Sequence, residues 1–379
     1  MAQKTLMLLE ASGIQDYIFG SNELAQHIGA SELVRLATEV WPEAELERYD
    51  AEVIYKGGGN MMLLFDDDAE AKRFAQSLSR RVLVDAPGLN LLVQRTAYTP
   101  GEQPLAKIHQ ALRQTLAARK GNHRPSVPLL GLGVTAECVY TGKPAVEVAP
   151  EDGRLIAAEV RAKRDMREAG NQQLLDQVPD VRKAGFDFVY NFDQVGTKGE
   201  SSYLAVIHTD GNCMGQRIKD LGADYIDDDE AYVQALRDFS ASVRKAADVA
   251  LNSTVRLLLD NTKVDDRDGK LKVRGVVEVH DNHLPFRPIV FGGDDVTFVC
   301  DGRLGLAITA HYLRVFSEQV LSDKHFAHAR AGVAVVKTHY PFSRAYELAE
   351  ALGGDQAGRV TGDVAESCIS ERADVLVSK

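Results

Sequence analysis

Cysteine is scarce in this chain, and long apolar runs are absent from it. Only four of its 379 residues are cysteine, widely separated and in no zinc-ligand spacing, so we expect structural thiols in a reducing compartment. No run approaches the roughly 18 apolar residues that a membrane helix needs. The first ten residues also lack the apolar core of a signal peptide. We therefore expect a cytoplasmic protein with no membrane partner.

Basic residues are outnumbered by acidic ones. The chain has 44 Lys and Arg against 55 Asp and Glu, a formal net charge of −11. This balance argues against a protein whose main task is to coat nucleic acid. It is compatible with nucleotide chemistry, because a site that binds polyphosphate through metal ions needs carboxylates rather than a basic surface.

The first half of the chain has a recognisable order of apolar segments. An apolar run at 5–10 predicts a strand, and a helical face follows it. Two further apolar runs, 53–55 and 61–65, flank the glycine-rich turn 56–60. Apolar run, glycine turn and apolar run together predict a β-hairpin.

The same order recurs in the second half. A strand is predicted at 203–207 and is followed by a long helical face from Tyr232 to Ala250. A second hairpin follows at 289–300, and then a helix at 304–321, a strand at 331–336 and a helix at 343–352. This order predicts an α+β fold with two ferredoxin-like domains packed together.

We expect three segments along the chain: a first domain at 1–115, an inserted connecting region at 116–199, and a catalytic domain at 200–379. The connecting region carries a basic helical patch between Arg161 and Arg167. That patch is predicted to be a solvated helix face, with a site for an activating ligand or an acidic partner as the alternative.

Three acidic residues of the second half should converge. Asp210 follows the strand at 203–207, and Asp294 and Asp295 occupy the turn of the second hairpin. Adjacent strands would bring these like charges together, which is costly unless cations neutralise them. Two Mg²⁺ or Mn²⁺ ions would do so, held by the three carboxylates and the backbone of Gly211. The alternative, a hairpin turn without function, is disfavoured by the preceding strand that ends in Asp-Gly.

Other residues are candidates for binding a nucleotide. Gly292 and Gly293 allow positive φ and a close approach of ligand to backbone. The turn 211–215, with Asn212 and Gly215, can offer N–H groups to phosphate. The further candidates are Lys337, expected after a strand near the same edge, and Ser12, Gln15 and Asn60 in the first domain.

Two residues near these motifs have an open role. His208, two residues before Asp210, is more typical of a core or supporting residue than of a base. Arg287, just before the second hairpin, either contacts a triphosphate or faces water.

These motifs resemble the palm domains of the large polymerase/cyclase subunit of type III CRISPR effector complexes. The second palm resembles 206–215, 291–295 and 332–341, and the first resembles 12–19 and 56–60. The resemblance implies two ferredoxin-like palms face to face. It also implies that ATP or a related triphosphate is converted with divalent metal into a cyclic nucleotide or oligonucleotide. The metal ligands of the family fall on Asp210, Asp294 and Asp295.

The chain also departs from the family. Asn212 stands where many relatives have a second acid, and the first domain has Glu10, Gly59 and Asn60 at the positions of the catalytic acids. We expect the first domain to be a scaffold or a second nucleotide pocket. We expect a stand-alone relative without the HD nuclease domain, acting in prokaryotic antiviral signalling outside a stable guide-RNA complex.

Two other functions stay open at this stage. One is a catalytically silent nucleotide-binding sensor, favoured by Asn212 and disfavoured by the intact Asp294–Asp295 pair. The other is a GTP-using enzyme of the diguanylate-cyclase type, because a Gly-Gly-Asp hairpin on this fold also serves guanine nucleotides. The sequence leaves open whether an effector protein responds to the product and whether the chain forms a homo-oligomer.

Overall fold

The computed structural model describes residues 3–122, 132–195 and 202–354, and the backbone of 374–377. Two compact units make up the chain. Unit 1 comprises Met1–Ser21, Gln26–Glu168 and Gly215–Ser240, and unit 2 comprises Asn22–Ala25, Ala169–Met214 and Ala241–Lys379. Each unit therefore combines pieces of the three predicted segments, because residues that follow Met214 return to unit 1.

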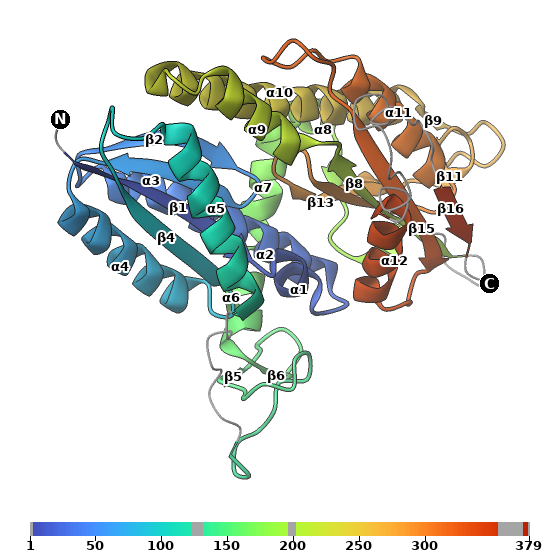
Figure 1. The fold of residues 1–379 in the computed structure, drawn as a ribbon. Coiled ribbons are helices and arrows are strands. Elements are labelled where there is room, and N and C mark those ends of the chain that lie inside the picture. Colours follow the sequence, from blue (N-terminus) through green and yellow to red (C-terminus); the bar gives the residue numbers. More distant parts are fainter. Residues whose placement is uncertain (1–2, 123–131, 196–201, 355–373, 378–379) are drawn as a thin grey trace. The chain divides into compact units, whose positions relative to one another are not determined.

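Unit 1 is built on a four-stranded antiparallel sheet with strand order β2-β3-β1-β4, the order of a ferredoxin-like fold (Figure 1). Its strands are β1 (Lys4–Ser12), β2 (Ala51–Gly57), β3 (Asn60–Phe65) and β4 (Asn90–Tyr98). Its helices are α1 (Ile14–Phe19), α2 (Leu24–Arg35), the π-helix η1 (Leu36–Val40), α3 (Trp41–Leu46), α4 (Asp68–Asp85), α5 (Leu105–Asn122), α6 (Ala158–Asp165) and α9 (Met214–Asp224).

Apolar spacing explains why these segments fold as they do. In α4 the buried residues Ala71, Phe74, Leu78 and Val82 recur every three or four positions and form one face of the helix. The carboxylate of Asp67 caps this helix by accepting a hydrogen bond from the backbone N–H of Ala69. The predicted first hairpin is confirmed, since β2 and β3 pair across the glycine turn.

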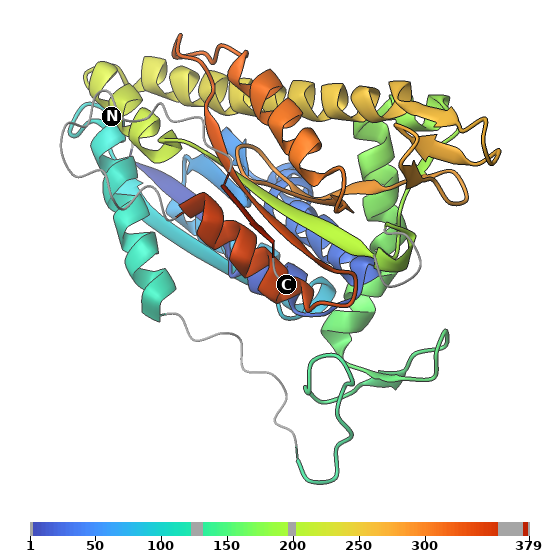
Figure 2. The ribbon, with the colours of Figure 1, turned by 90° about the vertical axis from the view of Figure 1, so that its right-hand side faces the viewer.

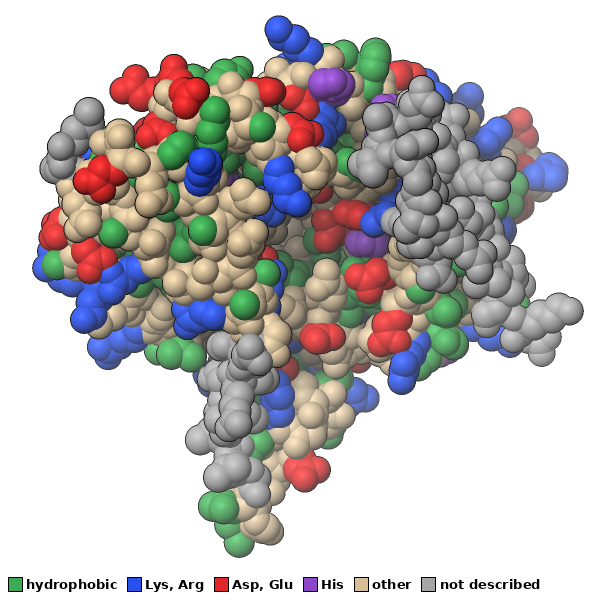
Figure 3. All heavy atoms as spheres, in the orientation of Figure 1, with side chains coloured by type: hydrophobic (Ala, Val, Ile, Leu, Met, Phe, Trp, Pro, Cys, Tyr) green, Lys and Arg blue, Asp and Glu red, His purple; other side chains and the backbone are tan. Residues whose placement is uncertain are grey.

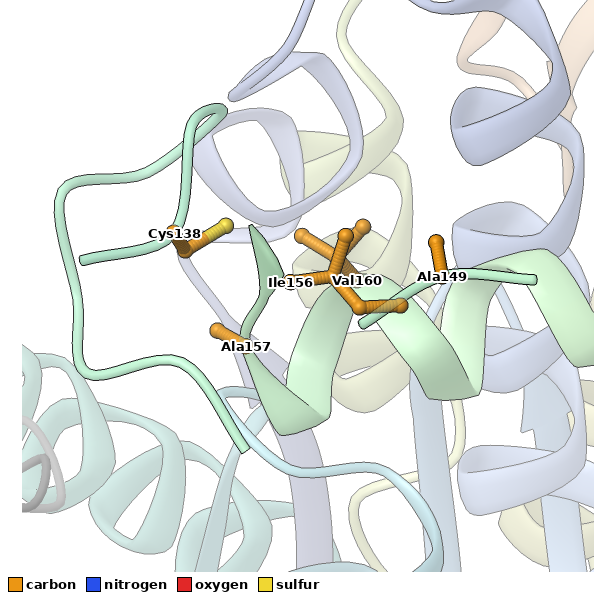
Figure 4. Packing of buried hydrophobic residues seen from close by; sticks show 5 residues of the cluster. All are labelled: Cys138, Ala149, Ile156, Ala157 and Val160. Atoms are coloured by element: carbon orange, nitrogen blue, oxygen red, sulfur yellow. The ribbon is translucent and has the colours of Figure 1, made fainter. Parts of the chain in front are cut away.

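A small lobe of unit 1 is formed by 132–157, with the short strands β5 (Glu147–Val148) and β6 (Leu155–Ile156). Its core is an apolar cluster in which β6 and α6 meet the loop of Cys138, and Figure 4 shows its five residues: Cys138, Ala149, Ile156, Ala157 and Val160. The lobe also leaves valines at the surface, with Val134 93% exposed, and Figure 3 shows hydrophobic side chains there.

The predicted basic patch is a solvated face only in part: Arg161 and Arg167 are exposed, whereas Lys163 and Arg164 of α6 are enclosed by partners. Lys163 is buried, donates from Nζ to the backbone carbonyl of Tyr17 at 2.6 Å, and lies 4.2 Å from the centre of the Tyr17 ring. Arg164 donates to the Tyr140 hydroxyl at 2.7 Å and to the Asp152 carboxylate at 3.2 Å. These side chains hold α6 and the lobe in place within unit 1, because each finds a partner in the folded unit.

Unit 2 contains a five-stranded sheet with order β13-β14-β8-β15-β16. Its first four strands repeat the ferredoxin-like order of unit 1, and β16 adds to the edge in parallel with β15. The strands of this sheet are β8 (Tyr203–Gly211), β13 (Phe286–Phe291), β14 (Val296–Asp301), β15 (Ala329–Lys337) and β16 (Asp374–Val377). The predicted α+β fold with a repeated ferredoxin-like unit is confirmed.

The remaining elements belong mainly to unit 2, but α7 begins in unit 1 and the part of α10 up to Ser240 also belongs to unit 1. The helices are α7 (Arg167–Gln177), α8 (Pro179–Lys183), η2 (Phe192–Gln194), α10 (Asp229–Asp260), α11 (Gly305–Ser317) and α12 (Phe342–Gly354). The minor strands are β7 (Asp187–Phe188), β9 (Thr262–Val264), β10 (Leu271–Val273), β11 (Val277–Glu278) and β12 (His283–Leu284). Helix α11 ends at Ser317, one turn before the predicted end at Leu321.

Helix α12 lies against β15 and β8. In the view of Figure 2 it lies in front of the sheet. The close approach depends on Gly332 in β15. A Cβ atom at this position would lie 1.8 Å from the carbonyl oxygen of Ala349 and 2.8 Å from the backbone nitrogen of Gly353. Because both atoms belong to backbone, no rotamer change of a neighbouring side chain could make room.

Two expectations from composition can be compared with the structure. Cys138 and Cys300 are free and buried, whereas Cys213 is disulfide-bonded, so the expectation of a free thiol is wrong for Cys213. Among the described residues, no helix combines the length and apolar character needed to cross a membrane.

We expect the substitution Gly332→Ala to destabilise unit 2. Overpacking against a fixed backbone typically costs ~1–3 kcal/mol, and urea unfolding followed by circular dichroism measures the change. The matched control is Gly121→Ala in α5, where an added Cβ meets no atom within 4 Å. A Gly332→Ala protein as stable as wild type would contradict the close approach of α12.

Candidate active site

The strands β8 and β14 bring the three predicted acids to one end of the unit 2 sheet. β8 is buried from Leu204 to Thr209, and Asp210 is its last residue but one. β14 pairs with β8 so that Val296 lies opposite Thr209. Asp294 and Asp295 directly precede Val296 in the turn after β13. The predicted adjacency of these two strands is therefore confirmed.

Gly211 allows the hairpin turn to approach β8 closely. A Cβ atom on Gly211 would lie 2.5 Å from Cβ of Asp294, 3.0 Å from its Oδ2 and 2.8 Å from Cε of Met214. The turn itself contains Gly293 at φ 128°, a conformation that other residues rarely adopt. Glycine at 211 and 293 thus permits the carboxylate of Asp294 to lie against the backbone that carries Asp210.

Burial and mutual repulsion raise the pKa of two of these carboxylic acids. Burial raises the pKa of Asp294, and the charge of Asp210 adds to the effect. Burial raises the pKa of Asp295 to about 7, with further contributions from Asp294, Asp210 and Glu350. Each effect makes the ionised form less favourable, so the site would gain from a cation.

Glu350 is an acid that the sequence did not single out. It lies in α12, on the helix that crosses β15 and β8, and it is exposed. Its charge contributes to the raised pKa of Asp295. No local motif marks Glu350, because only the packing of α12 on the sheet brings it near the hairpin turn.

Arg330 is the basic residue that the structure places at this edge. Arg330 lies directly opposite Asp210 in the pairing of β15 with β8. Its Nη2 donates to Oδ2 of Asp210 at 2.7 Å, and both side chains are a little more than one third exposed. No sequence pattern marks this pair, because it depends on the register of β15 against β8, which is set by folding.

His208 supports Asp295 rather than acting as an exposed base. The imidazole is buried and packs edge-on against the ring of Tyr346 from α12, with 5.3 Å between ring centroids. Its Nδ1 lies 3.4 Å from Oδ1 of Asp295. Burial lowers the pKa of His208, and the charge of Arg330 acts in the same direction while Asp210 opposes it. The neutral imidazole is therefore the favoured form.

The carboxylate oxygens of Asp210, Asp294 and Asp295 are chemically suited to bind a hard divalent cation. Carboxylate oxygens are the ligands that Mg²⁺ and Mn²⁺ prefer, and Oδ1 of Asp295 is buried without a hydrogen-bond partner. In the described part of the chain, however, no three His, Cys, Asp or Glu side chains are grouped as a ready metal cage. Asp210 is engaged by Arg330 in this arrangement.

Some of the residues predicted to bind phosphate or nucleotide lie where they were expected, whereas the backbone N–H of Asn212 already has a partner. The backbone N–H of Asn212 donates to the carbonyl of His328 at 2.8 Å, so this N–H is already used. Gly215 is the second residue of α9, and an added Cβ there would meet no atom within 4 Å. Gly292 and Gly293 lie in the hairpin turn beside Asp294, as expected.

Lys337 does not lie near the carboxylates, so that prediction is wrong. In the antiparallel pairing of β15 and β8, Arg330 lies opposite Asp210 whereas Lys337 lies opposite Tyr203. The two positions on β15 are seven residues apart (337 − 330), which corresponds to about 23 Å of strand. The sequence indicated a strand at this place but did not indicate which of its ends meets Asp210.

Arg287 is neither a phosphate contact nor a solvent-facing residue. It is 1% exposed and donates from Nη1 to Oδ1 of Asn171 at 2.8 Å and to the carbonyl of Val189 at 2.9 Å. Its guanidinium also lies 5.4 Å from the centre of the Tyr190 ring. Arg287 therefore belongs to the internal structure of unit 2.

Three candidate residues of unit 1 gather at one end of its sheet. Ser12 ends β1, Asn60 begins β3 opposite Glu10, and Gln15 lies in α1 just after β1. Asn60 donates from Nδ2 to the carbonyl of Gly58. Glu10 forms an ion pair with Lys120 of α5. At the positions that correspond to Asp210, Asp294 and Asp295, unit 1 thus has one acid, Glu10, which is paired with Lys120, together with Gly59 and Asn60.

Comparison with known proteins supports the fold. No protein-family model and no curated protein matches the chain. Solved structures do match: a Csm1–Csm4 cassette in complex with cA4 (13% identity, TM-score 0.56) and Csm1 from T. onnurineus (15% identity, TM-score 0.57). Each comparison covers 94% of this chain, which spans only about half of the matched chain, 53% and 52% respectively.

We expect Asp295 to make stability depend on pH. Because its pKa is raised from 3.8 to about 7 in the folded protein, the folded state binds the proton more tightly than the unfolded state. Stability should therefore fall as pH rises from about 4 to about 7. Asp295→Asn should remove this part of the fall and be more stable than wild type at pH 8, as measured by urea unfolding at several pH values.

The matched control for this measurement is Asp266→Asn, in an exposed loop after β9. It should leave the pH dependence as in wild type. If Asp295→Asn and Asp266→Asn gave the same profile, the assignment of the raised pKa to Asp295 would be wrong.

Proposed function

We propose that this protein is a nucleotidyl cyclase or cyclic-oligonucleotide synthase that acts on nucleoside triphosphates, with ATP favoured. The observation that carries the proposal is the packing of Asp294 against Gly211, beside Asp210, at one end of a ferredoxin-like sheet. The matched Csm1–Csm4 structures support ATP, since they are described in complex with cA4, AMPPNP and one ATP.

Asp210, Asp294 and Asp295, with the backbone of Gly211, are the residues that would hold two Mg²⁺ or Mn²⁺ ions. When bound, such ions favour ionisation of a ribose hydroxyl and neutralise charge on the departing pyrophosphate. In the reaction, the hydroxyl oxygen forms a bond to the α-phosphorus, the bond between the α-phosphorus and the α–β bridging oxygen breaks, and pyrophosphate leaves.

The other residues of the site orient and shield the acids. Gly292 and Gly293 leave the hairpin backbone accessible to a ribose or base, because neither carries a Cβ. His208, which is buried against the ring of Tyr346, lies beside Asp295 and restricts its position. A buried neutral imidazole with a lowered pKa is poorly placed to remove a proton from a substrate. The proton of the attacking hydroxyl is therefore expected to leave to water.

A signalling role follows from the same resemblance. A cyclic oligonucleotide made by this protein would act as a messenger in prokaryotic antiviral defence, and a separate effector protein would respond to it. The first palm, unit 1, would serve as a scaffold or as a second nucleotide pocket around Ser12, Gln15 and Asn60.

A nucleotide-binding sensor without turnover is the second candidate. It is favoured by the ion pair of Arg330 with Asp210 and by Asn212 in place of a second acid. The synthase would release pyrophosphate from a triphosphate, whereas the sensor would bind the nucleotide and release none. A GTP-using enzyme of the diguanylate-cyclase type differs from the favoured proposal only in the triphosphate consumed.

We expect metal-dependent release of pyrophosphate from ATP. The assay compares ATP, GTP, CTP and UTP, singly and mixed, with Mg²⁺ or Mn²⁺. Asp294→Ala/Asp295→Ala should reduce release by at least about a hundredfold, because metal ions supply several kcal/mol of transition-state stabilisation. Mass spectrometry of the product identifies the base, the linkage and the ring size.

The outcomes separate the three candidates. Release from GTP alone would favour the diguanylate-cyclase type. Bound nucleotide with no release under any metal or mixture would favour the sensor. Release that persists in the double variant would show that the hairpin acids are not the catalytic residues.

We also expect Lys337→Ala to retain pyrophosphate release within about twofold of wild type. The register places Lys337 at the opposite end of β8 from Asp210, and the Coulomb interaction of exposed charges this far apart is screened by salt. A much larger loss of release would contradict the assignment of the site to the Asp210 end of the sheet.

A further inference from the structure

Arg330 lies at the carboxylate edge, and neither the sequence nor the proposed reaction explains its role. It comes from β15, which follows the hairpin and α11 in the chain. Its position opposite Asp210 is set by the backbone pairing of two central strands rather than by a mobile loop. The ion pair between Nη2 and Oδ2, at 2.7 Å, is thus built into the sheet.

The pair divides the three acids into two classes. Asp210 has a guanidinium against its carboxylate. Asp294 lies against Gly211, the residue after Asp210, and Asp295 follows it in the hairpin turn. The Arg330 guanidinium therefore places its positive charge beside Asp210, the carboxylate that neighbours both Asp294 and Asp295.

Arg330 is not completely satisfied by this pair. Its Nε is buried without a hydrogen-bond partner, although the side chain as a whole is 35% exposed. A guanidinium offers five N–H donors in a planar fork that matches two oxygens of a carboxylate or phosphate. A single hydrogen bond to Asp210 uses only part of this capacity.

The repeated unit shows that the fold does not require arginine here. In unit 1 the residue of β4 opposite Glu10 is Leu92, an apolar side chain. There the acid finds its cation in α5, through Lys120. The cross-strand arginine therefore occurs in the unit that keeps the Asp294–Asp295 pair.

We infer that Arg330 is a displaceable counter-ion of the active site. This role rests on the proposed function. In the nucleotide-free protein, Arg330 neutralises Asp210. When a metal–triphosphate complex binds, Asp210 turns to the metal and the guanidinium is released to a phosphate oxygen. Arg330 thereby opposes binding of metal alone and favours binding of metal together with a triphosphate.

The experiment measures two affinities in Arg330→Gln and wild type. Binding of Mn²⁺ alone, followed by the free-ion signal in electron paramagnetic resonance, should become about threefold to fivefold tighter in Arg330→Gln, the range of a partly exposed ion pair. Binding of a nonhydrolysable ATP analogue at saturating Mn²⁺ should become weaker by a similar factor. A loss of folding would weaken both, so the opposite signs are specific to the inference.

Two further variants serve as controls. Arg330→Lys keeps the charge and should bind Mn²⁺ with nearly wild-type affinity. Arg314→Gln removes an exposed arginine of α11 that pairs with Glu318 in the same unit, and it should change neither affinity.

A measurement on the unaltered protein tests the same point if Arg330→Gln does not fold. The Nε–H resonance of Arg330, assigned by its absence in Arg330→Lys, should shift when Mg²⁺ and the analogue are added together. An unchanged resonance under saturating ligand would show that the ion pair stays in place and would overturn the inference.

The remaining outcomes separate this inference from the proposed function. Equal Mn²⁺ affinity in wild type and Arg330→Gln would overturn the inference alone and leave a merely structural ion pair. Tighter Mn²⁺ with unchanged analogue binding would overturn the transfer to phosphate. Absence of Mn²⁺ binding in wild type, with and without analogue, would overturn both the inference and the proposed function.

Discussion

The repulsion among carboxylates held at one end of a single sheet is the constraint on which the candidate site depends. Asp210 is fixed by the central strand β8, and Gly211 lets Asp294 approach that strand closely. Charge this concentrated is unfavourable in a partly buried place. The surrounding features can be understood as responses to it: a cross-strand arginine, a neutral buried histidine and two acids with raised pKa.

The two ferredoxin-like units show how one fold can hold such a site or do without it. Both have the same order of their first four strands, and in both a glycine-containing turn joins the hairpin strands. In unit 1 the corresponding end carries Glu10 paired with Lys120, together with Asn60. A neutralised single acid needs no ion, so unit 1 is free of the electrostatic cost that unit 2 bears.

Much of this arrangement follows from apolar periodicity. The strands, both hairpins and the meeting of Asp210 with Asp294 and Asp295 are predictable because buried strands and glycine turns leave strong local patterns. Lys337, Arg330 and Glu350 are different. Their places depend on the direction of β15 against β8 and on the way α12 crosses the sheet, which are properties of tertiary packing. Arg287 and Lys163 were misjudged for a related reason, since local sequence does not show that a charged side chain will be enclosed by partners.

Gly332 has a consequence for how this site can change over generations. Because the backbone of α12 rests on the strand at this glycine, the helix stays anchored while its outward positions are free to vary. Arg344 and Glu347 are exposed and pair only weakly across the helix surface. Glu350 is the exposed position of the same helix whose charge reaches Asp295, so a substitution there would change the electrostatics of the site without disturbing the contact at Gly332.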